Sequence, residues 1–184
     1  MFGMELTRQT PQANWPMPGA IVALLKPITW FPPMWAYACG AISTGHGMDG
    51  RLGFIVLGVL LAGPLLCGTS QAVNDWFDRH VDAINEPDRV IPSGRMPGHW
   101  GLYISIIMSA LSLVVAGLMG SFIFAAALLG LAFAWAYSAP PFRFKQNGWL
   151  GNGVVGFSFP SGLSAFPRGA EGMRCIKAED PRGL

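Results

Sequence analysis

Long apolar stretches separated by short polar segments run along most of the 184-residue chain. Acidic and basic residues are absent from residues 27–48, 52–74, 96–142 and 146–167. A helix that crosses a membrane needs about 20 mainly apolar residues, and a buried soluble helix rarely has an apolar run beyond about 14. The pattern therefore predicts an all-α fold, a polytopic transmembrane helix bundle. A partial fifth span is expected from Trp149, after four complete spans near residues 20–44, 53–74, 100–118 and 121–138.

Pro32, Pro33 and Pro64 are among the prolines inside these predicted spans. Proline lacks the amide hydrogen that continues the helical ladder, so each is expected to bend or break its helix. A bend at Pro64 would help to open a central cavity. Between the third and fourth spans, Gly117, Gly120 and Ser121 predict the turn.

Basic residues gather on one side of this predicted topology. That side holds the N-terminus and the segments 75–99 and 139–148, with Arg8, Lys26, Arg79, Arg89, Arg95, Arg143 and Lys145. The opposite side carries Arg51. Basic residues in short loops stay cytoplasmic, so the N-terminus is expected in the cytoplasm. A net charge of +2 is too small to favour a nucleic-acid partner, and the three cysteines have no spacing typical of zinc or disulfide frameworks.

Three aspartates follow the second predicted span at spacings i, i+3 and i+7: Asp75, Asp78 and Asp82. On a helix this spacing places their carboxylates on one stripe, with Asn74 close to it. The residues leave two alternatives open. The stripe is either a solvated helix end neutralised by Arg79 and later arginines, or a site for Mg²⁺, which proteins hold with one or two carboxylates plus substrate phosphates.

The loop that follows, residues 83–97, is rich in proline and carries arginines at both ends of its rigid part. Arg89 and Arg95 are candidates for binding phosphate, because a guanidinium fork matches phosphate oxygens bidentately. The alternative is that both arginines only mark the cytoplasmic side of the membrane.

The aspartate pattern with Asn74 resembles the first aspartate-rich motif of the UbiA-type intramembrane prenyltransferases. Three longer segments are similar to the chlorophyll and bacteriochlorophyll synthases within that family: residues 26–35, 74–94 and 136–145. The run from Ser70 to His80 favours the bacteriochlorophyll branch, with the chlorophyll branch as the alternative. The resemblance covers residues 20–157 and implies the N-terminal half of a bundle of about nine helices in an inner (cytoplasmic or intracytoplasmic) bacterial membrane.

This resemblance implies transfer of a geranylgeranyl or phytyl group from its diphosphate to the propionate of a bacteriochlorophyllide, with Mg²⁺ as cofactor. By position in the motifs, the polar residues that hold Mg²⁺ and the diphosphate would be Asn74, Asp75, Asp78 and Asp82. Tyr137, Ser138 and Lys145 match family positions near the diphosphate and the allylic carbon. A tyrosine and a lysine at a span end are also common as interfacial and topological anchors.

Three segments are therefore expected: an N-terminal cytoplasmic segment (1–19), a prenyltransferase-like membrane domain (20–157) and a divergent, flexible tail (158–184). The tail is rich in Arg, Gly, Glu and Pro and has no helical apolar period. Family members carry a second aspartate-rich motif in a later half, so a truncated chain is expected. The alternative to an active enzyme is a non-catalytic membrane subunit or truncated product, which pairs with another copy or with a pigment-pathway enzyme.

Overall fold

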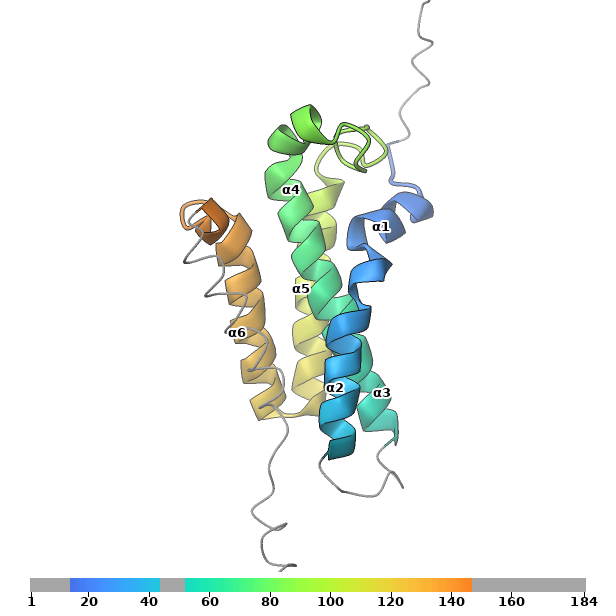
Figure 1. The fold of residues 1–184 in the computed structure, drawn as a ribbon, viewed down its shortest axis with the longest axis vertical. Coiled ribbons are helices and arrows are strands. Elements are labelled where there is room, and N and C mark those ends of the chain that lie inside the picture. Colours follow the sequence, from blue (N-terminus) through green and yellow to red (C-terminus); the bar gives the residue numbers. More distant parts are fainter. Residues whose placement is uncertain (1–13, 44–51, 147–184) are drawn as a thin grey trace, which may run out of the picture.

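A computed structural model describes residues 14–43 and 52–146, and all the regular structure in these two ranges is helical. The elements are α1 (Pro18–Leu25), η1 (Pro27–Thr29), α2 (Phe31–Ser43), α3 (Leu52–Leu60), η2 (Leu61–Cys67), α4 (Gly68–Asn85), α5 (Trp100–Met119), α6 (Ser121–Ser138) and η3 (Phe144–Gln146). Figure 1 shows α2, α5 and α6 running alongside the long helix that α3 and α4 form. The predicted fifth span near Trp149 and the predicted tail lie outside the described residues.

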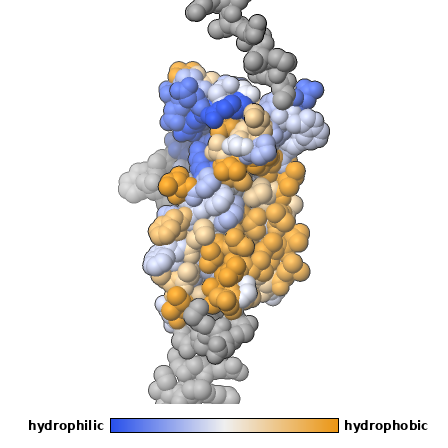
Figure 2. All heavy atoms as spheres, turned by 90° about the vertical axis from the view of Figure 1, so that its right-hand side faces the viewer, coloured by the Kyte–Doolittle hydropathy of each residue, from blue (hydrophilic) through white to orange (hydrophobic). Residues whose placement is uncertain are grey.

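Within residues 14–43 and 52–146, three helices are long and apolar enough to cross a membrane: Leu52–Asn85, Trp100–Met119 and Ser121–Ser138. The first of these helices consists of α3, η2 and α4 and is 34 residues long. It extends well beyond residue 74, where the apolar run of the predicted second span ends. Its last turns are amphipathic, so they stay helical while presenting polar side chains beyond the apolar region. Figure 2 shows apolar side chains over the middle and lower part of one face and hydrophilic ones at its upper end.

The predicted first span, residues 20–44, is two helices with a break between them. Lys26 ends α1 in the left-handed region with φ 48° and ψ 69°, and Pro27 begins η1. A residue that precedes proline is disfavoured in the α region, which explains why the break falls here. Pro32 and Pro33 instead occupy the first turn of α2, where a missing amide hydrogen costs little.

Pro64 disrupts the second span as expected, because it lies within the π-helical segment η2. This irregular segment packs against the break in the first span. A Cβ on Gly63 would lie 2.4 Å from Cγ of Met34, and one on Gly68 would lie 3.4 Å from Nε1 of Trp30. The absence of a side chain at Gly63 allows the two interrupted helices to approach closely, whereas a Cβ on Gly68 would make an ordinary van der Waals contact.

A buried cluster fixes the loop between α4 and α5 at one end of the bundle. Its members come from α1, α4, the loop and α5, and are Ala20, Leu24, Ala72, Val90, Met96 and Ile104. Within the loop, Val90 and Met96 are buried, and the amide of Met96 donates to the carbonyl of Val90 over 3.1 Å. The loop is thereby held against α1 and α4, although it has no regular structure.

Gly58 in α3 is expected to be required for the contact with α2. A Cβ there would lie 2.0 Å from Cζ of Tyr37, so Gly58→Ala should destabilise the protein by about 1–3 kcal/mol through overpacking. Gly53→Ala is the matched control, because, outside its own helix and chain neighbours, no atom of the described residues lies within 4 Å of its added Cβ. Thermal unfolding in detergent should show a lower midpoint for Gly58→Ala and an unchanged or higher one for Gly53→Ala. Equal midpoints would contradict the close contact.

Candidate functional site

The three aspartates lie on α4 at its polar end, as the spacing predicts. Asp75 and Asp82 are buried, with Asp75 only 3% exposed, and Asp78 is partly exposed. Burying a carboxylate is costly unless positive charge and hydrogen bonds compensate it. The neighbours of each carboxylate therefore determine what the stripe can do.

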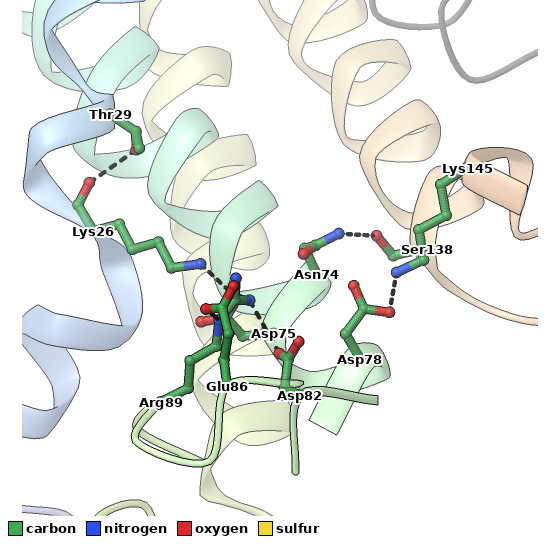
Figure 3. Close-up of polar contacts among 10 residues, drawn as sticks. All are labelled: Lys26, Thr29, Asn74, Asp75, Asp78, Asp82, Glu86, Arg89, Ser138 and Lys145. Atoms are coloured by element: carbon green, nitrogen blue, oxygen red, sulfur yellow. Dashed lines mark hydrogen bonds and ion pairs between the residues drawn. The ribbon is translucent and has the colours of Figure 1, made fainter. Parts of the chain in front are cut away.

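On one side of α4, two basic side chains meet the buried carboxylates (Figure 3). Nζ of Lys26 lies 2.7 Å from Oδ1 of Asp75. Arg89 places Nη1 3.3 Å from the same oxygen and 3.0 Å from Oδ2 of Asp82. Nε of Arg89 also pairs with the carboxylate of Glu86. One arginine of the loop thus connects three carboxylates, and the buried Val90 beside it holds the loop in place.

On the other side of α4, the end of α6 and η3 supply the partners (Figure 3). Nζ of Lys145 lies 2.5 Å from Oδ1 of Asp78. Nδ2 of Asn74 donates to Oγ of the buried Ser138 over 3.3 Å. Arg143, between these two elements, donates from Nη2 to a carbonyl of α4 over 3.2 Å. The polar end of α4 is therefore flanked by two groups of side chains, one on each side.

Outside the membrane-spanning helices, the ion pair of Arg89 and Glu86 shifts the pKa of both partners. The Arg89 guanidinium, hydrogen-bonded to Glu86, holds the pKa of that carboxyl below its usual range. The same hydrogen bond raises the pKa of Arg89. Arg89 is consequently a permanent cation at the centre of this group of acids.

The donor chemistry of the stripe fits a hard divalent cation such as Mg²⁺. Asp75, Asp78 and Asp82 offer carboxylate oxygens, and Asn74 offers an amide oxygen from the same helix face. Within the described parts of the chain, no three acidic, histidine or cysteine side chains lie close enough together to hold a metal ion by themselves. An open arrangement suits Mg²⁺, which keeps waters and substrate phosphate oxygens among its ligands.

Two predicted site residues lie apart from these contacts. Arg95 is exposed and donates within its own loop, from Nε to Oγ of Ser93 over 3.1 Å and from Nη2 to the carbonyl of Asp88 over 2.7 Å. It therefore contributes to the shape of the loop in this structure. Tyr137 is half-buried in the last turn of α6, beside Ser138.

Lys26 and Glu86 belong to the site, although the sequence pattern alone did not single them out. A signal for Lys26 was present: it is the only charged residue between positions 9 and 48. An ionisable residue isolated in an apolar span is by default a candidate for function. Glu86 had no such signal, because it lies in a loop with several other charges.

The UbiA prenyltransferase family profile matches residues 24–165, a range that includes every side chain of this site. The chain belongs to this family. Family membership, together with the three apolar helices in the described part of the chain, makes it an integral membrane protein.

Among its relatives, the chain is 61% identical over 144 residues to the "Bacteriochlorophyll synthase 33 kDa chain" of Rhodobacter capsulatus, and 54% identical to the protein of that name from Cereibacter sphaeroides. These matches cover 78% of this chain and 47% and 48% of the relatives, so the chain spans about half their length. "Chlorophyll synthase, chloroplastic" of Oryza sativa is 40% identical, over 74% of this chain and 39% of the relative. The predicted resemblance to the bacteriochlorophyll branch is confirmed. No solved structure matches the chain.

The pairing of Arg89 with Glu86 predicts a low carboxyl pKa that depends on the guanidinium. The pKa of Glu86 is lower in the folded protein than in the unfolded chain. The ion pair therefore stabilises the fold at pH values above the ordinary glutamate pKa. This stabilisation is lost as the pH falls through the lowered pKa of the folded protein. NMR titration of ¹³C-labelled glutamates in detergent, with Glu86→Gln to assign the signal, should show the low pKa. Arg89→Met should raise this pKa toward the ordinary glutamate value. A Glu86 titration that is the same with and without Arg89 would contradict this pairing.

Proposed function

We propose that this chain carries the N-terminal part of a prenyltransferase site that esterifies bacteriochlorophyllide with a geranylgeranyl or phytyl group from its diphosphate. The observation that carries the proposal is the acidic stripe of α4, flanked by basic side chains from the α1–η1 junction, the α4–α5 loop and η3. The identity of 61% to a bacteriochlorophyll synthase chain supports the choice of acceptor.

Breaking the allylic C–O bond places new negative charge on the diphosphate that leaves. Catalysis therefore depends chiefly on positive groups preorganised around that leaving group. Arg89 and Lys145 lie on the two sides of α4 and are proposed to bind diphosphate oxygens. Asp75, Asp78 and Asp82, with Asn74, would hold Mg²⁺, which when bound supplies Lewis-acid stabilisation of the leaving group.

The acceptor is a propionate whose oxygen forms the new C–O bond to the allylic carbon as the diphosphate departs. A carboxyl group has a pKa of about 4, so the propionate is already ionised near neutral pH and needs no general base. Tyr137 and Ser138, adjacent at the end of α6, are proposed to lie near the allylic carbon. The ring face of the tyrosine would stabilise positive charge developing there.

We place the protein in the inner membrane of a bacterium, cytoplasmic or intracytoplasmic, with its N-terminus in the cytoplasm. In Figure 1 the start of α1, the α4–α5 loop and the end of α6 lie toward the same end of the bundle. That end carries Arg79, Arg89, Arg95, Arg143 and Lys145. Such an excess of basic residues marks the cytoplasmic side.

Prenyl transfer by detergent-solubilised protein is the direct test of function. With bacteriochlorophyllide, geranylgeranyl diphosphate and Mg²⁺, esterified pigment should form and should disappear with EDTA. Asp75→Ala and Asp78→Ala should each lower the rate by about 100-fold or more, because a group that holds charge at the leaving group is lost. Asp88→Ala, an exposed acid of the loop, should retain activity.

Two results would contradict the proposal. Ester formation that is indifferent to EDTA and to both substitutions would place the chemistry elsewhere. The second result is that the protein forms no ester and shows no magnesium-dependent binding of geranylgeranyl diphosphate, while a full-length relative assayed in parallel is active. That result would indicate a non-catalytic membrane subunit.

The orientation predicts that green fluorescent protein fused before Met1 fluoresces in the bacterial cell. This reporter folds to its fluorescent form in the cytoplasm and stays dark when exported through the Sec pathway. A dark fusion, together with an enzymatically active alkaline phosphatase fusion at the same position, would reverse the topology.

A further inference from the structure

Lys26 stands out in the site because its backbone is strained and its side chain reaches a buried carboxylate. A non-glycine residue with φ 48° is uncommon, and such conformations persist where the surroundings hold them in place. Here the surroundings are specific. The carbonyl of Lys26 accepts hydrogen bonds from Oγ1 and the amide of Thr29, over 2.8 Å and 2.9 Å, and Nε1 of Trp30 donates to the carbonyl of Leu25 over 2.8 Å.

The π-helical segment of the second span supports this junction from the other side. Cys67, at the end of η2, places Sγ 3.6 Å from Oγ1 of Thr29 and 3.4 Å from its carbonyl oxygen. The irregular parts of two spans are thus packed together, and between them they fix where Lys26 leaves α1. π-Helical segments of this kind occur frequently at functional sites.

The two cations on Asp75 are held differently. Arg89 is also paired with Asp82 and Glu86, so several contacts restrain it. Within residues 14–43 and 52–146, the only acidic partner of the Lys26 ammonium is Asp75, and the side chain of Lys26 is 27% exposed. A flexible four-carbon stem with three donors can change partners more easily than a guanidinium fork held at three carboxylates.

We infer that the ammonium of Lys26 is the resident counter-ion of the Asp75 carboxylate. It leaves this carboxylate to a divalent cation only when a diphosphate binds and pairs with the ammonium instead. This inference rests on the proposed function, because it assigns the stripe to a metal-bound diphosphate. Lys26 is a positioning residue: its ammonium occupies Oδ1 of Asp75, an oxygen that a cation would need. A cation that arrives alone must displace it, whereas a cation accompanied by diphosphate offers the ammonium new oxygen acceptors.

The charge arrangement makes cation and diphosphate binding interdependent. A positive charge within a few ångströms of a carboxylate disfavours a second cation there and favours an anion. Loss of the Lys26 charge should therefore change the two affinities in opposite directions. A residue that merely maintained the fold would weaken both or neither.

The test measures Mn²⁺ binding by electron paramagnetic resonance of the free ion, with and without inorganic pyrophosphate, on the full chain in detergent. Without pyrophosphate, Lys26→Met should bind Mn²⁺ about tenfold more tightly than the parent protein. At saturating Mn²⁺, the same variant should bind pyrophosphate about tenfold more weakly. Lys26→Arg should restore both affinities toward those of the parent.

Arg79→Met is the matched control, because Arg79 is one helical turn from Asp75 and Asp82 but lies over the ring of Trp76 at 4.2 Å and donates to its carbonyl over 2.8 Å. Since this cation makes no ion pair with the stripe in the described residues, Arg79→Met should change both affinities much less than Lys26→Met does. Lys26→Gln, which keeps a hydrogen-bond donor without the charge, is expected to match Lys26→Met and replaces it if that variant fails to fold by circular dichroism.

Mn²⁺ binding that is unchanged, weaker or undetectable in folded Lys26→Met or Lys26→Gln would overturn the inference. The measurement without pyrophosphate requires no prenyl transfer, so it separates this inference from the proposed function. Tighter Mn²⁺ binding in a protein that forms no ester would retain the counter-ion role while the proposed activity fails.

Discussion

The burial of one carboxylate, that of Asp75, is the constraint on which the rest of the site depends. A charge that is 3% exposed at the end of an apolar bundle requires nearby compensation. Lys26 and Arg89 supply it from two different segments of the chain. The helical break after α1 and the buried anchoring of the α4–α5 loop are the structural means by which these two cations reach the same oxygen.

This constraint explains why both of the first two spans are irregular. An uninterrupted first span would not have the turn at Lys26 that ends α1, and the η2 segment gives that turn a surface to pack against. Gly63 allows the approach of the two spans because it carries no side chain. Local departures from ideal helix geometry thus place a charged site at the end of an otherwise apolar bundle.

Much of this arrangement could be predicted from the sequence, because it depends on local patterns. The apolar runs predict the membrane helices, and the spacing of Asp75, Asp78 and Asp82 predicts the stripe that α4 displays. The exact path of the first span was harder to predict. Pro32 and Pro33 suggested a bend within it, yet they sit in the first turn of α2, and the break precedes Pro27.

Contacts between distant segments could not be predicted by pattern alone. The hydrogen bond from Asn74 to Ser138 and the ion pair of Lys145 with Asp78 depend on how α6 packs against α4. The position of the Lys26 side chain depends on the packed junction between the first two spans. The position of Arg95 in its loop depends on hydrogen bonds to Ser93 and Asp88. Each is a property of tertiary packing, whereas periodicity reports only which face a residue occupies.

The central claim is that the α4 stripe binds a metal-bound allylic diphosphate. Crystals grown with Mn²⁺ and an unreactive thio analogue of geranylgeranyl diphosphate would test it most directly, because anomalous scattering locates the manganese without reference to the protein. We expect manganese at the carboxylates of Asp75, Asp78 or Asp82, with analogue phosphates between Arg89 and Lys145. Manganese and analogue bound together elsewhere, with the Lys26–Asp75 pair intact, would contradict the claim.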